Sequence, residues 1–150
     1  MLPSPIVEEF DGIHIVRDDL LEGGTKRRLF TEYIKHFPND QEFVYASPRQ
    51  GYGQLALSLS CRDLGKQAVV FVPKGKRHQL TIDSEKYGAE IHEVPMGFLS
   101  NLNHKSKKYC EENNSHLLPF GGDHPIIVES MTNLCKQIKV VPSEIWSVIS

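Results

Sequence analysis

"IHIVRDDLLEGGTKRRLFTEYI", residues 13–34, is the stretch that decides the fold. An apolar segment leads through two aspartates and two glycines into a lysine and two arginines, which open an apparent helix. The helix dipole repels cations at a helix start, so their placement here requires an explanation. Thr25 is the expected N-cap, which places Lys26 in the first turn.

Regular apolar patterns continue along the rest of the chain. Segments rich in β-branched residues predict strands at 12–16, 42–46, 67–72, 89–94, 115–119 and 144–149. Apolar residues at helical spacing predict helices at 26–37, 53–64, 78–87, 99–113 and 124–138, the last with Asp123 as its N-cap. Strands that alternate with helices of this length are typical of βαβ units, so we expect an α/β protein with a mostly parallel sheet.

Length and composition narrow the class of protein. The chain has 150 residues, enough for one domain with a real core, and a net charge of −2 gives no general reason to expect nucleic-acid or anionic-membrane binding. No apolar run approaches the ~20 residues of a membrane span. The three cysteines and seven histidines show neither disulfide nor metal-site spacing, so no metal is expected and a reducing cytoplasm is the default.

The last residues, "PSEIWSVIS" (142–150), end the chain directly on a predicted buried strand. Chain termini normally lie solvated at the surface. We therefore expect a fragment, or a shortened relative, of a longer protein.

The segment "QGYGQLA" (50–56) follows a predicted strand and opens a predicted helix. Gly51, Gly53 and Ala56 fit the spacing of a loop that binds phosphate on free backbone N–H groups. The next strand is followed by Pro73 and Lys74 where a NAD site has an acidic residue, so only a NADP site would fit. The alternative is a glycine turn that lets the helix pack closely.

The three cations of "EGGTKRR" (22–28) do not fit a Walker A loop, because Lys26 follows Thr25 and the earlier glycine is missing. One interpretation is a solvated basic cluster. In the other, Arg27, Arg28 and the positive helix end disfavour the ammonium form of Lys26. A neutral lysine amine can attack an aldehyde and form a Schiff base.

Five segments, taken in order, resemble one known family: "LPSPI" (2–6), "IHIVRDDL" (13–20), "GGTKRRL" (23–29), "LGKQAVVFVP" (64–73) and "LLPFGGDHPI" (117–126). They resemble the fold type II pyridoxal-phosphate (PLP) enzymes, the tryptophan synthase β-like group. Within it they are most similar to the branch of D-cysteine desulfhydrase and aminocyclopropane-carboxylate deaminase. The resemblance covers nearly the whole chain.

The resemblance implies roles for individual residues. The family's Gly-Gly-Asn-Lys-x-Arg-x-Leu motif corresponds to "GGTKRRL", which makes Lys26 the Schiff-base lysine with Arg28 in support. The family's asparagine that bonds the PLP 3′-hydroxyl aligns with Tyr52. Either the Tyr52 phenol substitutes, Gln50 or Gln54 reaches in after a one-residue shift, or the contact is lost. The implied cofactor-binding residues are Lys26, Gly51, Tyr52, Gly53 and Gln54, and the implied substrate-binding residues are Ser47, Gln50 and Tyr52.

The resemblance also implies an architecture, a three-layer αβα fold with mostly parallel sheets and without the family's C-terminal part. Residues 1–47 would belong to the large PLP domain, 48–142 would form a small inserted α/β domain, and 143–150 would be a strand returning to the large domain. A single compact unit is the alternative. The family's phosphate-binding loop follows the strand equivalent to "EIWSVIS", where this chain ends.

The expected function is that of a PLP-dependent lyase or deaminase acting on an amino acid or amino-acid-like substrate through a Lys26 Schiff base, with Lys26 later transferring the proton. The full-length protein is expected to be a cytoplasmic homodimeric enzyme, and an inactive 150-residue chain is compatible with the missing loop. The alternatives are a catalytically degenerate binding module, a viral PLP enzyme acting on amino-acid-modified thymine in DNA, and a NADP-binding Rossmann domain.

Overall fold

A four-stranded parallel sheet forms the centre of the molecule, which a computed structural model describes over residues 1–95 and 98–147. The strand order is β5-β4-β3-β6, with the register Val44 to Val69 and Val70 to Ile91. The strands are β3 (Glu42–Ala46), β4 (Gln67–Pro73), β5 (Glu90–Val94) and β6 (His116–Leu117). The predicted parallel sheet is confirmed, although β6 is shorter than the expected 115–119.

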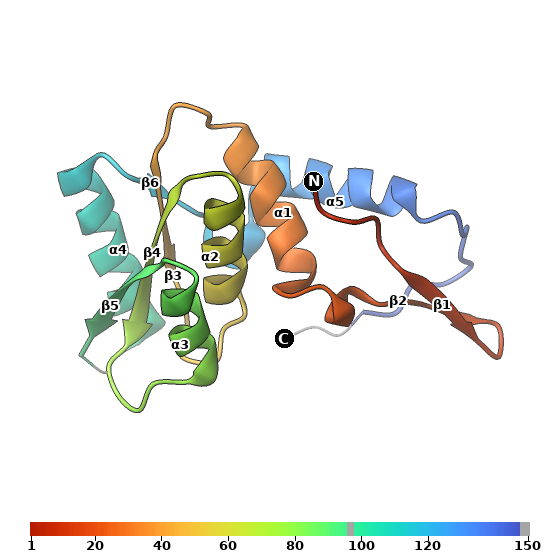
Figure 1. Ribbon diagram of the computed structural model, residues 1–150, viewed down its shortest axis with the longest axis horizontal. Helices are drawn as coiled ribbons and strands as arrows, with labels where there is room; N and C mark the ends of the chain where they lie inside the picture. The colour runs from red at the N-terminus through yellow and green to blue at the C-terminus, as the bar shows by residue number, and fades with distance from the viewer. Residues whose placement is uncertain (96–97, 148–150) are drawn as a thin grey trace.

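Helices cover both faces of this sheet. They are α1 (Gly24–Lys35), α2 (Gly53–Asp63), α3 (Gln79–Lys86), α4 (Leu99–Asn113) and α5 (Pro125–Gln137). Figure 1 shows α2 and α3 on one face of the sheet and α4 on the other. Because side chains alternate along a strand, Phe43 and Tyr45 of β3 join the core beneath α1 and α2, whereas Val44 and Ala46 join the core beneath α4. The expected three-layer αβα fold is confirmed.

The apolar stripe of α1 places this helix on the first core. Leu29, Phe30, Tyr33 and Ile34 are all buried, as their helical spacing predicts, and α5 packs against the same helix. Each such side chain contributes about 1.5–3 kcal/mol through removal of its apolar surface from water. The face of α1 that carries these residues is therefore fixed against the sheet.

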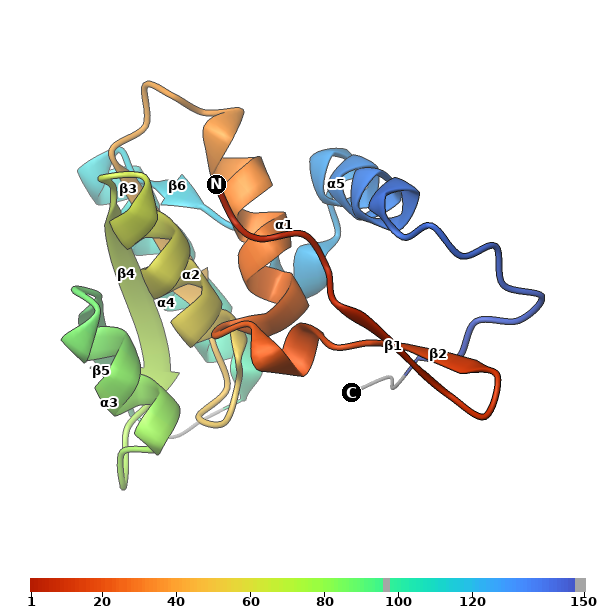
Figure 2. The ribbon, with the colours of Figure 1, turned by 45° about the vertical axis from the view of Figure 1, so that its right-hand side comes forward.

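An N-terminal hairpin stands apart from the sheet, as Figure 2 shows. It consists of β1 (Val7–Phe10) and β2 (Ile13–Val16), joined through Asp11 at φ 49° and Gly12 at φ 81°. Positive φ at both turn residues is what a type I′ hairpin turn requires, and Asp-Gly is a favoured sequence for it. Sequence analysis predicted only the second strand, although this dipeptide signals both.

Three local predictions are wrong. Residues 144–147 form no strand, and Ile145 and Trp146 are exposed, because the described chain offers them no neighbouring strand; residues 148–149 of that prediction lie outside the described residues. The N-cap of α1 is Gly23 rather than Thr25. The N-cap of α5 is His124 rather than Asp123, because the imidazole Nδ1 accepts the backbone N–H of Ile126 at 3.2 Å.

The expected division after Ser47 would separate β3 from β4, which are hydrogen-bonded neighbours in one sheet from the Glu42–Gln67 pair to the Ala46–Phe71 pair. As a statement about domains it stays a prediction, but β3 belongs structurally with the elements that follow it. Within residues 1–95 and 98–147, every helix is too short or too polar to span a lipid bilayer.

Candidate functional site

The start of α1 is built from a short 3-10 helix, η1 (Asp18–Leu20), and two glycines. Gly23 has φ 88°, a left-handed conformation that glycine adopts without strain, and the helix begins at Gly24. The hydroxyl of Thr25 does not cap the helix, because it donates a hydrogen bond to Asp18 Oδ2 at 2.8 Å. Thr25 therefore joins the helix to η1.

Carboxylates compensate both arginines beside Lys26. Arg28 Nε donates to Asp18 Oδ1 at 3.0 Å, with both side chains nine-tenths buried. Arg27 donates to Asp63 Oδ2 of α2 at 2.5 Å. Breaking a buried pair such as Arg28–Asp18 by removing one partner typically costs about 3–5 kcal/mol. Ion pairs thus offset the dipole repulsion at this helix start, and neither arginine is the free cation that sequence analysis assumed.

Lys26 differs from its neighbours. It is exposed, and its amine has no hydrogen-bond or ion-pair partner among the residues that the structure describes. Phe30 and Tyr33 follow it at i+4 and i+7, the spacing of one helix face. Lys26 therefore continues the core-facing stripe of α1, yet its side chain is not covered.

The packing of that stripe indicates where Lys26 lies. Tyr33 contacts His116, which pairs with Phe43 near the start of β3, and Phe30 stacks edge-on against Tyr45 near its end, with 5.5 Å between ring centroids. Lys26 lies one turn further in the same direction, about 6 Å along the axis.

This direction takes Lys26 to the carboxyl end of β3, where Ser47 and the loop before α2 begin. Both ribbon views agree, because the first turn of α1 and the loop after β3 lie toward the end at which the strand arrows point (Figures 1 and 2). In parallel sheets this edge is where ligands bind, at the point where neighbouring strands continue in opposite directions. Here that point lies between β3 and β6.

The loop 47–54 is held mainly by its own hydrogen bonds. Ser47 is buried and its hydroxyl donates to the carbonyl of Pro48 at 3.0 Å. The Gln54 amide is fully buried; its nitrogen donates to the carbonyl of Gly51 at 3.0 Å, and its oxygen accepts the hydroxyl of Thr81 at 2.8 Å. The predicted cofactor role of Gln54 and substrate role of Ser47 stay predictions, but both side chains already support the loop.

The outer side of this loop carries the other predicted residues. Gln50 and Tyr52 are exposed, and Tyr52 precedes α2 directly with 55% of its surface accessible. A phenol and an amide in this position can donate or accept hydrogen bonds toward a ligand at the strand ends. Their roles toward a cofactor or substrate stay predictions.

The two glycines of the loop allow close packing. A Cβ at Gly51 would lie 2.4 Å from Ser47 Oγ, and a Cβ at Gly53 would lie 2.5 Å from Tyr45 Cε1. Protein atoms therefore fill the space that a side chain would need at either glycine. This geometry favours the packing interpretation of "QGYGQLA" over phosphate binding.

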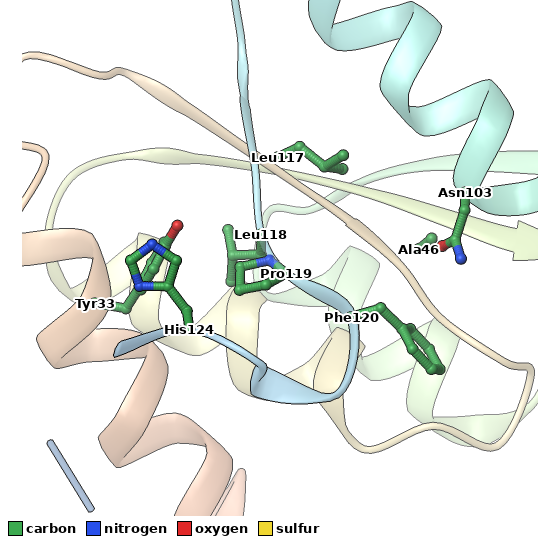
Figure 3. A pocket seen from close by; sticks show the side chains of 8 residues that line it. All are labelled: Tyr33, Ala46, Asn103, Leu117, Leu118, Pro119, Phe120 and His124. Atoms are coloured by element: carbon green, nitrogen blue, oxygen red, sulfur yellow. The ribbon is translucent and has the colours of Figure 1, made fainter. Parts of the chain in front are cut away.

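A cavity of about 230 Å³ lies beside β6 (Figure 3). Tyr33 and His124 line one side of it, and Asn103 and Phe120 line the other. Lys26 is not among the described residues that line this cavity. The cavity is therefore a feature of the sheet edge, separate from the start of α1.

A hydrogen-bond chain that the sequence did not predict lies next to this cavity. Asp40 Oδ2 lies 2.7 Å from His116 Nδ1, and His116 Nε2 lies 2.9 Å from the Tyr33 hydroxyl. Burial, with a smaller contribution from the charge of Asp40, raises the pKa of Tyr33. The three residues are far apart in sequence, so no local pattern could have identified them. Asp18 was also missed, although two aspartates before a cationic helix start are a readable signal.

The fold is similar to that of solved enzyme structures. An ACC deaminase homologue matches 95% of this chain and 50% of its own, with a TM-score of 0.78 and 15% identity. An L-serine ammonia-lyase from the fungus Rhizomucor miehei matches 91% of this chain and 46% of its own, with a TM-score of 0.73 and 14% identity. A pyridoxal 5′-phosphate-dependent aspartate racemase matches 83% of this chain and 38% of its own, with a TM-score of 0.66 and 18% identity.

These comparisons show the fold. It is the fold type II architecture of PLP enzymes, over the half or less of their length that this chain spans. No family model matches the sequence, and no curated protein matches it. The D-cysteine desulfhydrase and aminocyclopropane-carboxylate deaminase branch stays a prediction.

Proposed function

We propose that this chain carries the lysine-bearing part of a PLP-dependent enzyme, a lyase or deaminase that acts on an amino acid or amino-acid-like substrate. One observation carries the proposal: Lys26 has the only charged side chain in the first turn of α1 without a partner among the described residues, on the helix face that leads toward the carboxyl end of β3. The similarity in fold to PLP enzymes supports the choice of cofactor.

The residues present fit the aldehyde end of PLP. When bound, PLP supplies an aldehyde for an amine and an electron-withdrawing ring next to the reacting carbon. Lys26 Nζ would hold the aldehyde and, once released, would move a proton at the carbon beside the substrate amine. The free backbone N–H groups at the start of α2 would favour a substrate carboxylate near Tyr52. At Gly51 and Gly53 the space beside Cα is filled by protein atoms, so both glycines serve the packing of the loop.

Borohydride reduction tests the role of Lys26. The purified chain is mixed with PLP, reduced, digested and mapped by mass spectrometry. A pyridoxyl group on Lys26 is expected, absent in Lys26→Arg and retained in Lys35→Arg, because Lys35 of the same helix already pairs with Glu32 at 2.6 Å. Label on other lysines only, or no label on a folded chain at saturating PLP, would contradict the proposal.

A catalytically degenerate binding module is the second candidate. It is favoured by the loop 47–54, where Ser47 and Gln54 are engaged internally and protein atoms fill the space beside Gly51 and Gly53. A yellow protein that gains a visible absorbance band with PLP supports the enzyme. A colourless protein that cannot be loaded supports the module. Retention of a nicotinamide nucleotide would instead support the Rossmann alternative, which the filled glycine space disfavours.

The substrate, compartment and assembly are part of the proposal. We place the enzyme in the cytoplasm as a homodimer, with a free amino acid or a close analogue as substrate. The alternative is a viral PLP enzyme whose substrate is the larger amino-acid-modified thymine in DNA. Turnover assays on D-cysteine, on aminocyclopropane-carboxylate and on modified DNA would separate these substrates, and light scattering would give the assembly.

A further inference from the structure

We propose that Asp18 is a positioning residue for the Lys26 amine, acting through Thr25 and Arg28 on the first turn of α1. This inference rests on the proposed function, because it matters only if Lys26 holds the cofactor. Asp18 is buried, with 7% of its surface exposed, and it lies in η1 outside the helix that it holds. Its effect on Lys26 is therefore exerted through the backbone.

Asp18 holds the turn at two points. Its Oδ2 accepts the Thr25 hydroxyl at 2.8 Å, and its Oδ1 accepts Arg28 Nε at 3.0 Å. The two donors precede and follow Lys26 within one turn. Attachment at two points restricts both the position and the rotation of this turn more than a single contact would.

Helix geometry shows that Asp18 does not act on the amine directly. Successive residues are about 100° apart around the axis, so Thr25 and Arg28 are only about 60° apart and face Asp18 together. Lys26 lies about 130° from the direction midway between them. The carboxylate therefore turns Lys26 away from η1, toward the stripe that Phe30 and Tyr33 continue.

The adjacent residue provides a matched comparison. Asp19 is exposed and binds Arg17 at 2.8 Å, without any hydrogen bond or ion pair to α1 among the described residues. The chain thus holds two neighbouring carboxylates with one arginine each. Only Asp18 is linked to the first turn that carries Lys26.

The experiment compares Asp18→Asn, Asp19→Asn, Thr25→Val and Thr25→Ser with the wild-type chain. Hydrogen exchange of the Arg27 and Arg28 amides measures closure of the first turn without any cofactor. Borohydride reduction in the presence of PLP measures how much of Lys26 is labelled, and so how often its amine is placed to react with the aldehyde. Acetylation of Lys26 relative to Lys35 by acetic anhydride measures plain accessibility.

In Asp18→Asn and Thr25→Val, we expect faster exchange and a trapped label on Lys26 lowered by about ten- to a hundredfold, the usual effect of misplacing a reacting group. Relative acetylation should not change, because Lys26 is exposed in either case. Asp19→Asn and Thr25→Ser should behave as the wild type, the latter because it keeps the hydroxyl.

Unchanged exchange and label in Asp18→Asn, with a labelled wild type, would overturn the positioning role alone. An unlabelled wild-type Lys26 would overturn the proposed function together with it. If Asp18→Asn does not fold by circular dichroism, the difference between Thr25→Val and Thr25→Ser decides, and equal behaviour of these two variants overturns the proposal.

Discussion

Replacement of Gly53 by alanine should destabilise the fold, although alanine is the better helix former. The new Cβ would lie 2.5 Å from Cε1 and 2.8 Å from Cζ of Tyr45, distances that real Cβ atoms do not tolerate. The Tyr45 ring cannot easily move away, because it is 4% exposed and stacks edge-on against Phe30. Either the start of α2 or the strand β3 must shift.

The size of the effect follows from two opposing contributions. Overpacking a buried site typically costs about 1–3 kcal/mol. Exchange of glycine for alanine in a helix returns up to about 1 kcal/mol. The net loss in the free energy of unfolding should therefore be about 1–2 kcal/mol, which in a domain of this size lowers Tm by about 3–6 °C.

Urea unfolding followed by circular dichroism measures this loss. The matched background is Tyr45→Leu, which removes the ring atoms that the new methyl group would meet. In that background Gly53→Ala should be neutral or stabilising, so the double-mutant cycle should show a coupling of at least about 1 kcal/mol. A neutral Gly53→Ala in the wild-type chain, with additive effects in the cycle, would refute the packing argument and reopen phosphate binding at this loop.

Two further predictions concern titratable side chains. Burial raises the pKa of Cys61 to about 12 and that of Cys110 to about 11. A thiol reagent at neutral pH should therefore modify only the exposed Cys135 until the chain unfolds. Rapid reaction of all three thiols in the native chain would contradict this prediction. Burial alone would raise the pKa of Asp63, but hydrogen bonds from Arg27 and a neighbouring arginine lower it overall. Its ionised form therefore stabilises the fold above the ordinary carboxyl pKa, and this part is lost as pH falls below about 4. Asp63→Asn should flatten the acid side of the stability curve measured by urea unfolding, and an unchanged slope would contradict the assignment.

Periodicity was enough to predict most of the fold. The apolar stripe of α1 and the alternating burial of side chains along β3 both follow from the spacing of apolar residues. This spacing can be read from a short segment of sequence. The predicted C-terminal strand is wrong, although it rested on the same kind of apolar pattern as the strands that were predicted correctly. An apolar segment such as the one around Trp146 favours burial, but it forms a strand only if a neighbouring strand provides backbone hydrogen bonds. Among the described residues no strand lies beside it.

The site itself could be predicted only in part. Lys26 and the loop before α2 were proposed because a motif and a glycine pattern mark them, and their functional roles stay predictions. The partners of that loop were not predicted, since the Gln54–Thr81 and Asp40–His116–Tyr33 contacts join residues that lie far apart along the chain. Local spacing carries no signal for such contacts.

The cations at the start of α1 do not act on Lys26 in the way that the sequence suggested. Arg27 and Arg28 were expected to disfavour the charged form of Lys26, yet each is compensated by a carboxylate, from α2 and from η1. A compensated arginine exerts little net field on a neighbour, because the two opposite charges act from nearly the same place. The case for Lys26 therefore rests on its position. Arg27, Arg28 and Thr25 are held by hydrogen bonds, whereas Lys26 has no partner among the described residues and lies on the helix face that leads toward the end of β3.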